Sequence, residues 1–245
     1  MVDEVLARSF EGIGEDYDRY RPGFPAAAAE LLVPGRVARA LDLGAGTGKF
    51  TTLLLGRAEQ VVAVEPSAAM LDVLRAKTLP VDALLGSAER IPVPGSSMDV
   101  VSVAQAFHWF ERDQDCAEIH RVLVEGGRLG LIWNRSDPSC AWDRAAHRVA
   151  HPAVSDADET TTAAAEQLPG FELIARQELR WSESITRTDY LRRWATVSTL
   201  LVADAAARAD MLGRIDGILD AHPDTRGSDE LLLPIVTDVF VYLRA

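Results

Sequence analysis

The stretch "LDLGAGTGKF", residues 41–50, decides the fold and points to a ligand site. An apolar run ends at Leu43, and three glycines follow at positions 44, 46 and 48. Glycine adopts left-handed backbone conformations at little cost and lets a ligand approach the main chain closely. Because residues 49–57 suit a helix, the segment predicts a strand, a tight turn and a helix. On its own, this pattern also fits a plain connecting turn.

The glycine spacing excludes two common nucleotide-binding loops. A phosphate-binding P-loop needs G-x-x-x-x-G-K-[ST], but Leu43 stands where the first glycine should be, and Phe50 replaces the hydroxyl residue. A dinucleotide loop needs G-x-G-x-x-G, but the third glycine would fall at Lys49 or Thr51. The turn is therefore unsuited to a pyrophosphate.

An acidic residue ends the next apolar segment. Glu65 closes "VVAVE" (61–65), seventeen positions after Gly48. A carboxylate at the end of the second strand can accept hydrogen bonds from both hydroxyls of a ribose. A solvated acid at a strand end is the plain alternative. Together with the glycine turn, however, Glu65 favours a ligand that carries a ribose.

Short apolar segments alternate with amphipathic ones through the first half of the chain. The expected strands are 37–43, 60–65, 81–86, 98–106 and 128–133, and the expected helices are 49–57, 67–77 and 113–127. Such alternation is typical of βαβ units and a parallel sheet. With later strands at 171–182 and 230–244, we predict an α/β fold: a doubly wound, Rossmann-like, mostly parallel seven-stranded sheet with a helical cap.

Charge and composition limit the partners. The net charge of −12 repels phosphate backbones, so we expect no nucleic acid partner. No apolar run reaches the about 18 residues of a membrane span, and the acidic start "MVDEVLARSF" is unlike a secretory signal, so a cytoplasmic location is expected. Cys116 and Cys140 match no zinc spacing, and no metal is expected.

Four segments, taken in order, resemble a known enzyme family. They are "LDLGAGTG" (41–48), "VVAVEPSAAML" (61–71), "GSAERIPVPGSSMDVV" (86–101) and "AFHWF" (106–110). Together they resemble the class I S-adenosylmethionine-dependent methyltransferases, in particular the small-molecule branch with ubiquinone/menaquinone-type and trans-aconitate-type enzymes. The resemblance covers roughly residues 10–137. It implies S-adenosyl-L-methionine as cofactor and methyl transfer to O, N or C of a small-molecule acceptor.

The resemblance also implies a cofactor site. Asp42 and the backbone of the glycine turn would bind the amino-acid end of the cofactor, where a helix N-terminus favours the carboxylate. Glu65 would take the ribose hydroxyls. Ser87 stands where many relatives carry an aspartate that bonds the adenine amine. The expected cofactor-binding residues are Tyr17, Tyr20, Arg21, Asp42, Gly44, Ala45, Gly46, Gly48, Glu65, Pro66, Met70, Ser87, Ala88, Glu89 and Gln105.

Other residues are candidates for the acceptor side. His108 follows the fourth strand, and its ordinary pKa suits a general base, although a structural histidine in a turn is the alternative. The segment "DYDRYRPGFP" (16–25) is similar to a lid, in which a tyrosine face would suit a sulfonium. Arg192 and Arg193, on an expected cap helix, are either surface charges or a fork for a carboxylate-bearing acceptor. "WNRSDP" (133–138) is expected to supply polar groups in the loop after the fifth strand.

The chain is interpreted as one methyltransferase domain, residues 1–245. It divides into an N-terminal lid segment (1–30), a cofactor-binding core (31–137), helical cap insertions (138–229) around the late strand near 171–182, and a closing strand (230–245). Cap helices are expected over 140–152, 159–170, 187–201 and 204–222, with Thr186 or Thr188 and Asp204 as N-caps.

Two other functions stay open at this point. An NAD(P)-dependent oxidoreductase shares the sheet and the ribose acid, and a non-catalytic nucleoside-binding protein could use the same fold. The acceptor, the oligomeric state and the pathway are not indicated by the sequence.

Overall fold

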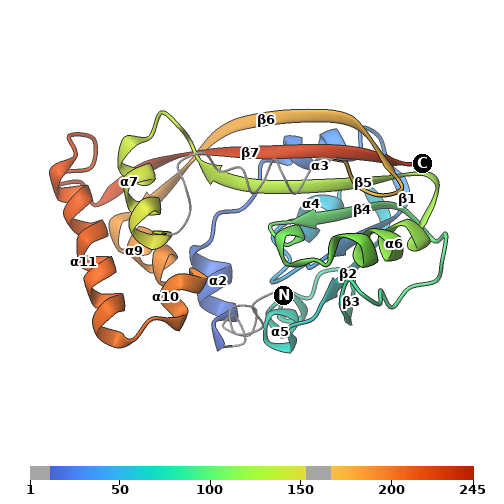
Figure 1. Cartoon of the computed structure of the whole chain (residues 1–245), viewed down its shortest axis with the longest axis horizontal. Coiled ribbons are helices and arrows are strands. Elements are labelled where there is room, and N and C mark those ends of the chain that lie inside the picture. The colour runs from blue at the N-terminus through green and yellow to red at the C-terminus, as the bar shows by residue number, and fades with distance from the viewer. Residues whose placement is uncertain (1–11, 153–166) are drawn as a thin grey trace.

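A computed structural model describes residues 12–152 and 167–245. Seven strands form one sheet in the order β3-β2-β1-β4-β5-β7-β6 (Figure 1). Neighbours from β3 to β5 pair in parallel, and β7 lies antiparallel between β5 and β6. The strands are β1 (Val37–Leu43), β2 (Ala58–Glu65), β3 (Asp82–Leu85), β4 (Met98–Ala104), β5 (Leu123–Ser136), β6 (Phe171–Thr186) and β7 (Glu230–Arg244). The predicted mostly parallel, doubly wound sheet is confirmed.

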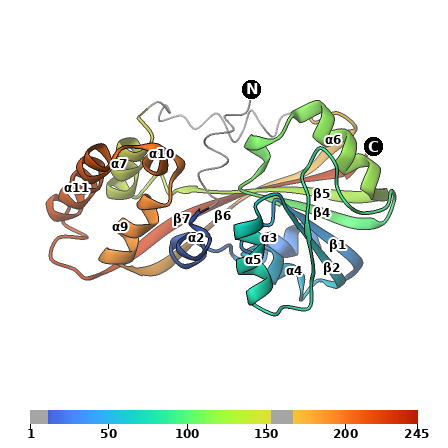
Figure 2. The ribbon, with the colours of Figure 1, turned by 90° about the horizontal axis from the view of Figure 1, so that it is seen from below.

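Helices cover both faces of the sheet (Figure 2). One face carries α3 (Ala26–Leu32), α4 (Thr51–Leu54) and α5 (Ala68–Ala76), and the other carries α6 (Arg112–Val122). Alternate strand residues point to opposite faces, so each face has its own core. Leu32 packs in the same cluster as Val61, and Ile119 packs in the same cluster as Val101.

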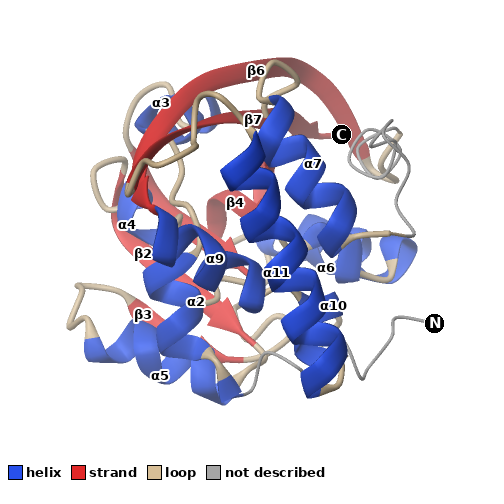
Figure 3. Cartoon of the chain, turned by 90° about the vertical axis from the view of Figure 1, so that its left-hand side faces the viewer, coloured by secondary structure: helices blue, strands red, loops and turns tan. Residues whose placement is uncertain are grey.

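The long strands β6 and β7 carry the cap (Figures 1 and 3). Its helices are α7 (Ala141–Ala150), α9 (Arg187–Ala195), α10 (Ser198–Val202) and α11 (Ala205–Ala221). Trp142, Tyr190 and Trp194 are buried there against Leu231 and Leu233 of β7. The cap therefore has a separate hydrophobic core that is fixed to the sheet through β7.

Three helix starts follow the predicted capping chemistry. The side chain of Ser67 accepts a hydrogen bond from the Met70 N–H, that of Thr186 from Asp189, and that of Asp204 from Ala207. Each side chain satisfies one of the N–H groups that a helix leaves unpaired in its first turn. These N-cap predictions are confirmed.

Several expected boundaries are wrong. The helix expected over 113–127 ends at Val122, and β5 begins at Leu123 because Leu123 pairs with Met98 of β4. The helix expected over 49–57 is reduced to α4, and that over 187–201 divides into α9 and α10 at Thr196–Val197. Most of the helix expected over 159–170 lies outside the described residues.

Helix α2 (Gly14–Tyr20) lies between the cap and the sheet (Figures 1 and 2). It contacts α5 of the core and α9 of the cap. Gly14 allows the close approach to α5, because a Cβ there would lie 2.9 Å from Cγ2 of Val73. Among the helices of the described residues, none is long and apolar enough to cross a membrane.

Candidate active site

The glycine turn joins β1 to α4 at the carboxyl end of the sheet. Gly44, Gly46 and Gly48 have φ angles of 68°, 54° and 86°, which strongly favour glycine. A Cβ at Gly44 would lie 2.7 Å from the Cβ of Ala106, and one at Gly48 would lie 2.3 Å from Cδ1 of Leu74. A Cβ at Gly46 would meet no described atom within 4 Å. Gly46 therefore leaves room for a ligand beside the main chain.

Glu65 ends β2 and faces this turn. Its Oε2 accepts the Gly46 N–H at 2.8 Å, and its Oε1 accepts the Ser67 N–H at 2.9 Å. Each carboxylate oxygen keeps a second lone pair for another donor. Burial raises the pKa of Glu65, while the hydrogen bonds from Ser67 and Gly46 oppose that rise. The two backbone bonds hold both carboxylate oxygens in place.

Asp42 lies beneath the turn and is buried. Its Oδ2 accepts the Thr51 hydroxyl at 2.6 Å, and its Oδ1 accepts the Ser102 hydroxyl at 2.7 Å. These bonds connect β1 to α4 and β4. Burial raises the pKa of Asp42 to about 6, although the bonds from Thr51 and Ser102 lower it. Asp42 thus supports the turn from below.

This burial predicts a pH-dependent stability difference. A raised pKa means that the folded protein binds the Asp42 proton more tightly than the unfolded chain, so this group lowers the free energy of unfolding as pH rises from about 4 to about 6. Asp42→Asn removes that titration. We expect the melting temperature of Asp42→Asn minus that of wild type to increase over this range and then level off. A difference independent of pH would contradict the prediction, and the exposed Asp82→Asn is the control.

Asp18 of α2 joins this helix to the glycine turn. Its Oδ1 accepts the Thr47 hydroxyl and the Lys77 ammonium, both at 2.7 Å, and its backbone oxygen accepts the Lys49 ammonium at 2.5 Å. Lys49 and Lys77 are the only lysines in the sequence. Sequence reasoning missed Asp18, and only the rarity of lysine in the chain could have drawn attention to its partners.

The lid segment contains three expected cofactor-binding residues, Tyr17, Tyr20 and Arg21, and they face two directions. Tyr17 lies close enough to Glu65 for the carboxylate charge to raise the tyrosine pKa, in addition to the larger effect of burial. Tyr20 and Arg21 face the cap: the Tyr20 hydroxyl accepts from Nη1 of Arg192 at 2.5 Å, and Nη2 of Arg21 donates to the Thr196 carbonyl at 3.0 Å. Of these three residues, Tyr17 is the one whose pKa the Glu65 charge affects.

The loop after β3 lies beside Glu65. The Gly86 N–H donates to the Glu65 carbonyl at 3.2 Å, which brings Ser87, Ala88 and Glu89 to the same edge of the sheet. Ala88 is buried, Ser87 is half-buried and Glu89 is exposed. In the loop and helix after β2, Pro66 is exposed and Met70 is buried. The expected adenine-side residues thus follow two neighbouring strands.

Gln105 follows β4 in a left-handed conformation, with φ of 57°. Its N–H donates to the Ile132 carbonyl, and its Nε2 donates to the Asn134 carbonyl at 3.0 Å. Such a conformation is uncommon for a residue other than glycine and is found at functional sites. The bonds fix Gln105 between the carboxyl end of β4 and the neighbouring β5.

The prediction that a polar loop begins directly after Trp133 is wrong. Asn134 and Arg135 belong to β5 and pair with Thr237 and Val236 of β7. Arg135 forms ion pairs with Asp238 and Glu178, which is a structural arrangement on the strand surface. The antiparallel partner β7 extends β5 beyond the apolar run, and the sequence of β5 alone does not show this.

His108 lies in a short 3₁₀ helix, Phe107–Trp109, after β4. The imidazole is exposed and tilts against Trp109, with ring centroids 4.9 Å apart. Phe107 is buried and packs edge-on against Trp133, so it belongs to the core. Trp109 and Phe110, which follow His108 in the sequence, are half-buried.

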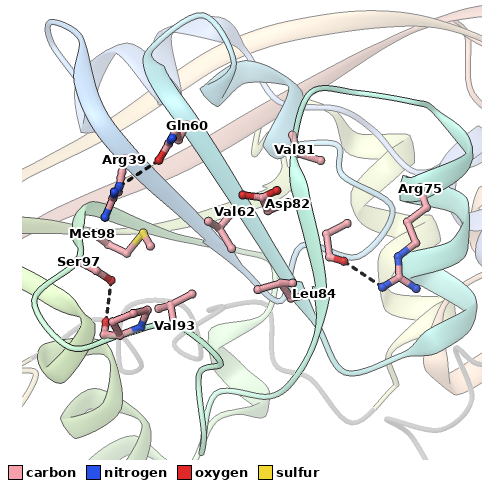
Figure 4. A pocket seen from close by; sticks show the side chains of 12 residues that line it. Arg39, Gln60, Val62, Arg75, Val81, Asp82, Leu84, Val93, Ser97 and Met98 are labelled. Atoms are coloured by element: carbon pink, nitrogen blue, oxygen red, sulfur yellow. Dashed lines mark hydrogen bonds between the residues drawn. The ribbon is translucent and has the colours of Figure 1, made fainter.

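A cavity of about 570 Å³ lies at the opposite end of the sheet (Figure 4). Arg39, Gln60, Asp82 and Met98 line it and stand near the starts of β1 to β4. Ligands of open α/β sheets bind at the carboxyl ends of the strands. We therefore assign the candidate site to the glycine-turn end and not to this cavity.

Known proteins with similar sequences are methyltransferases. A family model described as "Methyltransferase domain" matches residues 41–131. Uncharacterised methyltransferases of Mycobacterium bovis and Mycobacterium tuberculosis are each 39% identical over 95% of this chain and 94% of their own length. The chain belongs to the methyltransferase family. It is a class I, S-adenosylmethionine-dependent enzyme, as the sequence resemblance implies.

A solved structure agrees with this assignment. A protein of Anaeromyxobacter dehalogenans, described as a putative type II methyltransferase, is 25% identical, has a TM-score of 0.70, and matches over 91% of this chain and 97% of its own. The similarity therefore extends across both the sheet and the cap. The oxidoreductase alternative is not favoured.

Proposed function

We propose that this methyltransferase binds S-adenosylmethionine at the glycine turn and Glu65, and transfers its methyl group to a small acceptor that carries a carboxylate. The observation that carries the cofactor part is the Glu65 carboxylate, which two backbone N–H groups hold beside the open space at Gly46. We propose no nucleic acid partner, because the net charge of −12 disfavours binding to a phosphate backbone.

The residues at the carboxyl edge fit this cofactor. Glu65 is suited to bind the ribose hydroxyls, and the Gly46 position allows close approach to the backbone. Tyr17 lies near Glu65, and a tyrosine face attracts a cationic group. Met70 and Ala88 are apolar and almost fully buried, and in this proposal they pack on the adenine side. In this proposal Asp42 keeps the turn in shape from below, and Gln105 lines the methionine end.

Bound S-adenosylmethionine supplies an electrophilic methyl carbon on a cationic sulfur. An acceptor with a free lone pair would take up this methyl group, and S-adenosylhomocysteine would be left as the second product. The protein positions the acceptor and excludes water. For a neutral oxygen or nitrogen acceptor, a proton must also leave, and we propose that the His108 imidazole takes it.

Glu65→Ala tests the cofactor assignment. The variant loses two hydrogen bonds to a charged acceptor, each worth roughly 1.5–3 kcal/mol, and water in the vacated site recovers part of this. We expect S-adenosylhomocysteine to bind about ten-fold to a hundred-fold more weakly by isothermal titration calorimetry. The control is Glu59→Ala, an exposed acid near the other end of the same strand. Equal affinity in folded Glu65→Ala and wild type would disprove the assignment.

A further inference from the structure

Unpaired buried polar atoms gather where the cap meets α2. Within the described residues, Nε of Arg21 and Nε and Nη1 of Arg193 are buried and have no hydrogen-bond partner. A buried donor without an acceptor costs roughly 1–3 kcal/mol, and more when it is charged. All three atoms are donors. Their concentration at one junction indicates a site that an acceptor-rich ligand would complete.

Arg21 and Arg193 approach this junction from different elements. Arg21 ends α2, and Arg193 lies on α9. The Arg193 charge is close enough to lower the pKa of Arg21, in addition to the larger effect of burial. The two cations therefore destabilise each other unless a negative charge lies between them.

Among the described residues, no carboxylate contacts Arg21 or Arg193 to supply this negative charge. Across residues 12–152 and 167–245, neither guanidinium forms an ion pair with a carboxylate. The Oδ1 of Asp143 accepts the Tyr190 hydroxyl at 2.7 Å, and Glu183 acts on Arg193 only at longer range. Other arginines at the cap and sheet, such as Arg135 and Arg187, have direct carboxylate partners.

The junction is continuous with the cofactor end of the site. Tyr17 lies in α2, and Arg21 is the C-cap residue of this helix, whose N–H donates to the Tyr17 carbonyl. The guanidinium carbon of Arg21 lies 5.4 Å from the centre of the Tyr17 ring, and Tyr17 is near Glu65. A ligand bound at Arg21 would therefore be separated from the Glu65 carboxylate by one side chain, that of Tyr17.

We propose that Arg21 and Arg193 together bind the carboxylate of the methyl acceptor. The planar guanidinium presents a fork of N–H donors that matches a carboxylate, and one carboxylate has enough lone pairs for the three unpaired N–H groups. This inference rests on the proposed function and moves Arg21 from the cofactor to the acceptor. Because the two arginines lie on α2 and α9, the acceptor site exists only while the lid helix contacts the cap.

The test is a thermal-shift screen of protein saturated with S-adenosylhomocysteine. The probes are acetate, succinate, glutarate and benzoate, each beside its uncharged amide. At saturation we expect at least one acid to raise the melting temperature by about 5 °C or more, and its amide to have no effect. Arg193→Met and Arg21→Met should weaken binding of that acid at least about ten-fold. The control is Arg214→Gln, an exposed arginine on α11, which should respond like wild type.

A second measurement separates binding from folding. Arg193→Met removes buried donors that have no partner, so without any acid we expect it to melt no lower than wild type. A merely structural arginine would lower the melting temperature when removed. The inference is overturned if no acid stabilises the wild type, or if Arg193→Met keeps the full acid response. Calorimetry with S-adenosylhomocysteine distinguishes these outcomes from failure of the proposed function. If the proposed function is wrong, S-adenosylhomocysteine itself does not bind.

Discussion

Gly46→Val is expected to abolish cofactor binding while the protein stays folded. A Cβ at this position meets no described atom, so the side chain itself has room in the protein. The branched side chain would occupy the space where the cofactor has to approach the main chain. Because a rigid ligand cannot adjust, we expect this overlap to cost about 3 kcal/mol or more, the upper end of overpacking penalties, which is at least about a hundred-fold loss of affinity for S-adenosylhomocysteine.

The left-handed backbone at Gly46 requires a matched control. Valine at a φ of 54° is strained by about 1–2 kcal/mol, whatever the ligand does. Gly227 has a φ of 71°, also has no described atom within 4 Å of its Cβ position, and lies in the loop before β7. Gly227→Val should therefore show similar strain in its melting temperature and bind the cofactor normally. If Gly46→Val binds like Gly227→Val, the turn only connects β1 to α4.

The sheet and one edge of the site could be predicted because their signals are local. Buried parallel strands have continuous apolar runs, and their carboxyl ends meet at one edge. Gly46 and Glu65 could therefore be placed near each other from their positions after β1 and at the end of β2. The structure joins them by the bond from the Gly46 N–H to Oε2 of Glu65.

The contacts of α2 could not be predicted because they join residues far apart in the chain. Asp18 meets Lys77, and Arg21 meets Thr196, 175 positions later. No local pattern marks such partners. The sequence suggests Arg192 and Arg193 as either surface charges or a carboxylate fork, but it contains no sign that Arg193 lies near Arg21. The extension of β5 through Asn134 had the same cause, since it depends on pairing with β7. Side chains whose roles depend on tertiary contacts require the structure.

His108→Asn is expected to lower the turnover number by about 10²–10⁴-fold with little change in cofactor affinity, because a positioned general base contributes about that much. Asparagine retains a polar group of similar size but cannot take a proton at neutral pH. His108 is exposed at the end of β4 and could exchange the proton with solvent. The control is His222→Asn. His222 follows α11 in the cap, so this substitution should leave the turnover number unchanged.

The pH–rate profile decides whether His108 is a base. Only neutral imidazole accepts a proton, so the wild-type rate should rise with pH through a group near about 6.5, the ordinary imidazole pKa. His108→Asn should lose this rise.

An acceptor whose reacting atom is already anionic needs no base, and His108 would then only orient it. In that case the substitution would raise KM more than it lowers kcat. Equal pH profiles and similar kcat for the two proteins, measured with an acid found in the thermal-shift screen, would exclude the base role. Positioning by Arg21 and Arg193, with exclusion of water, would then account for the acceptor side of the reaction.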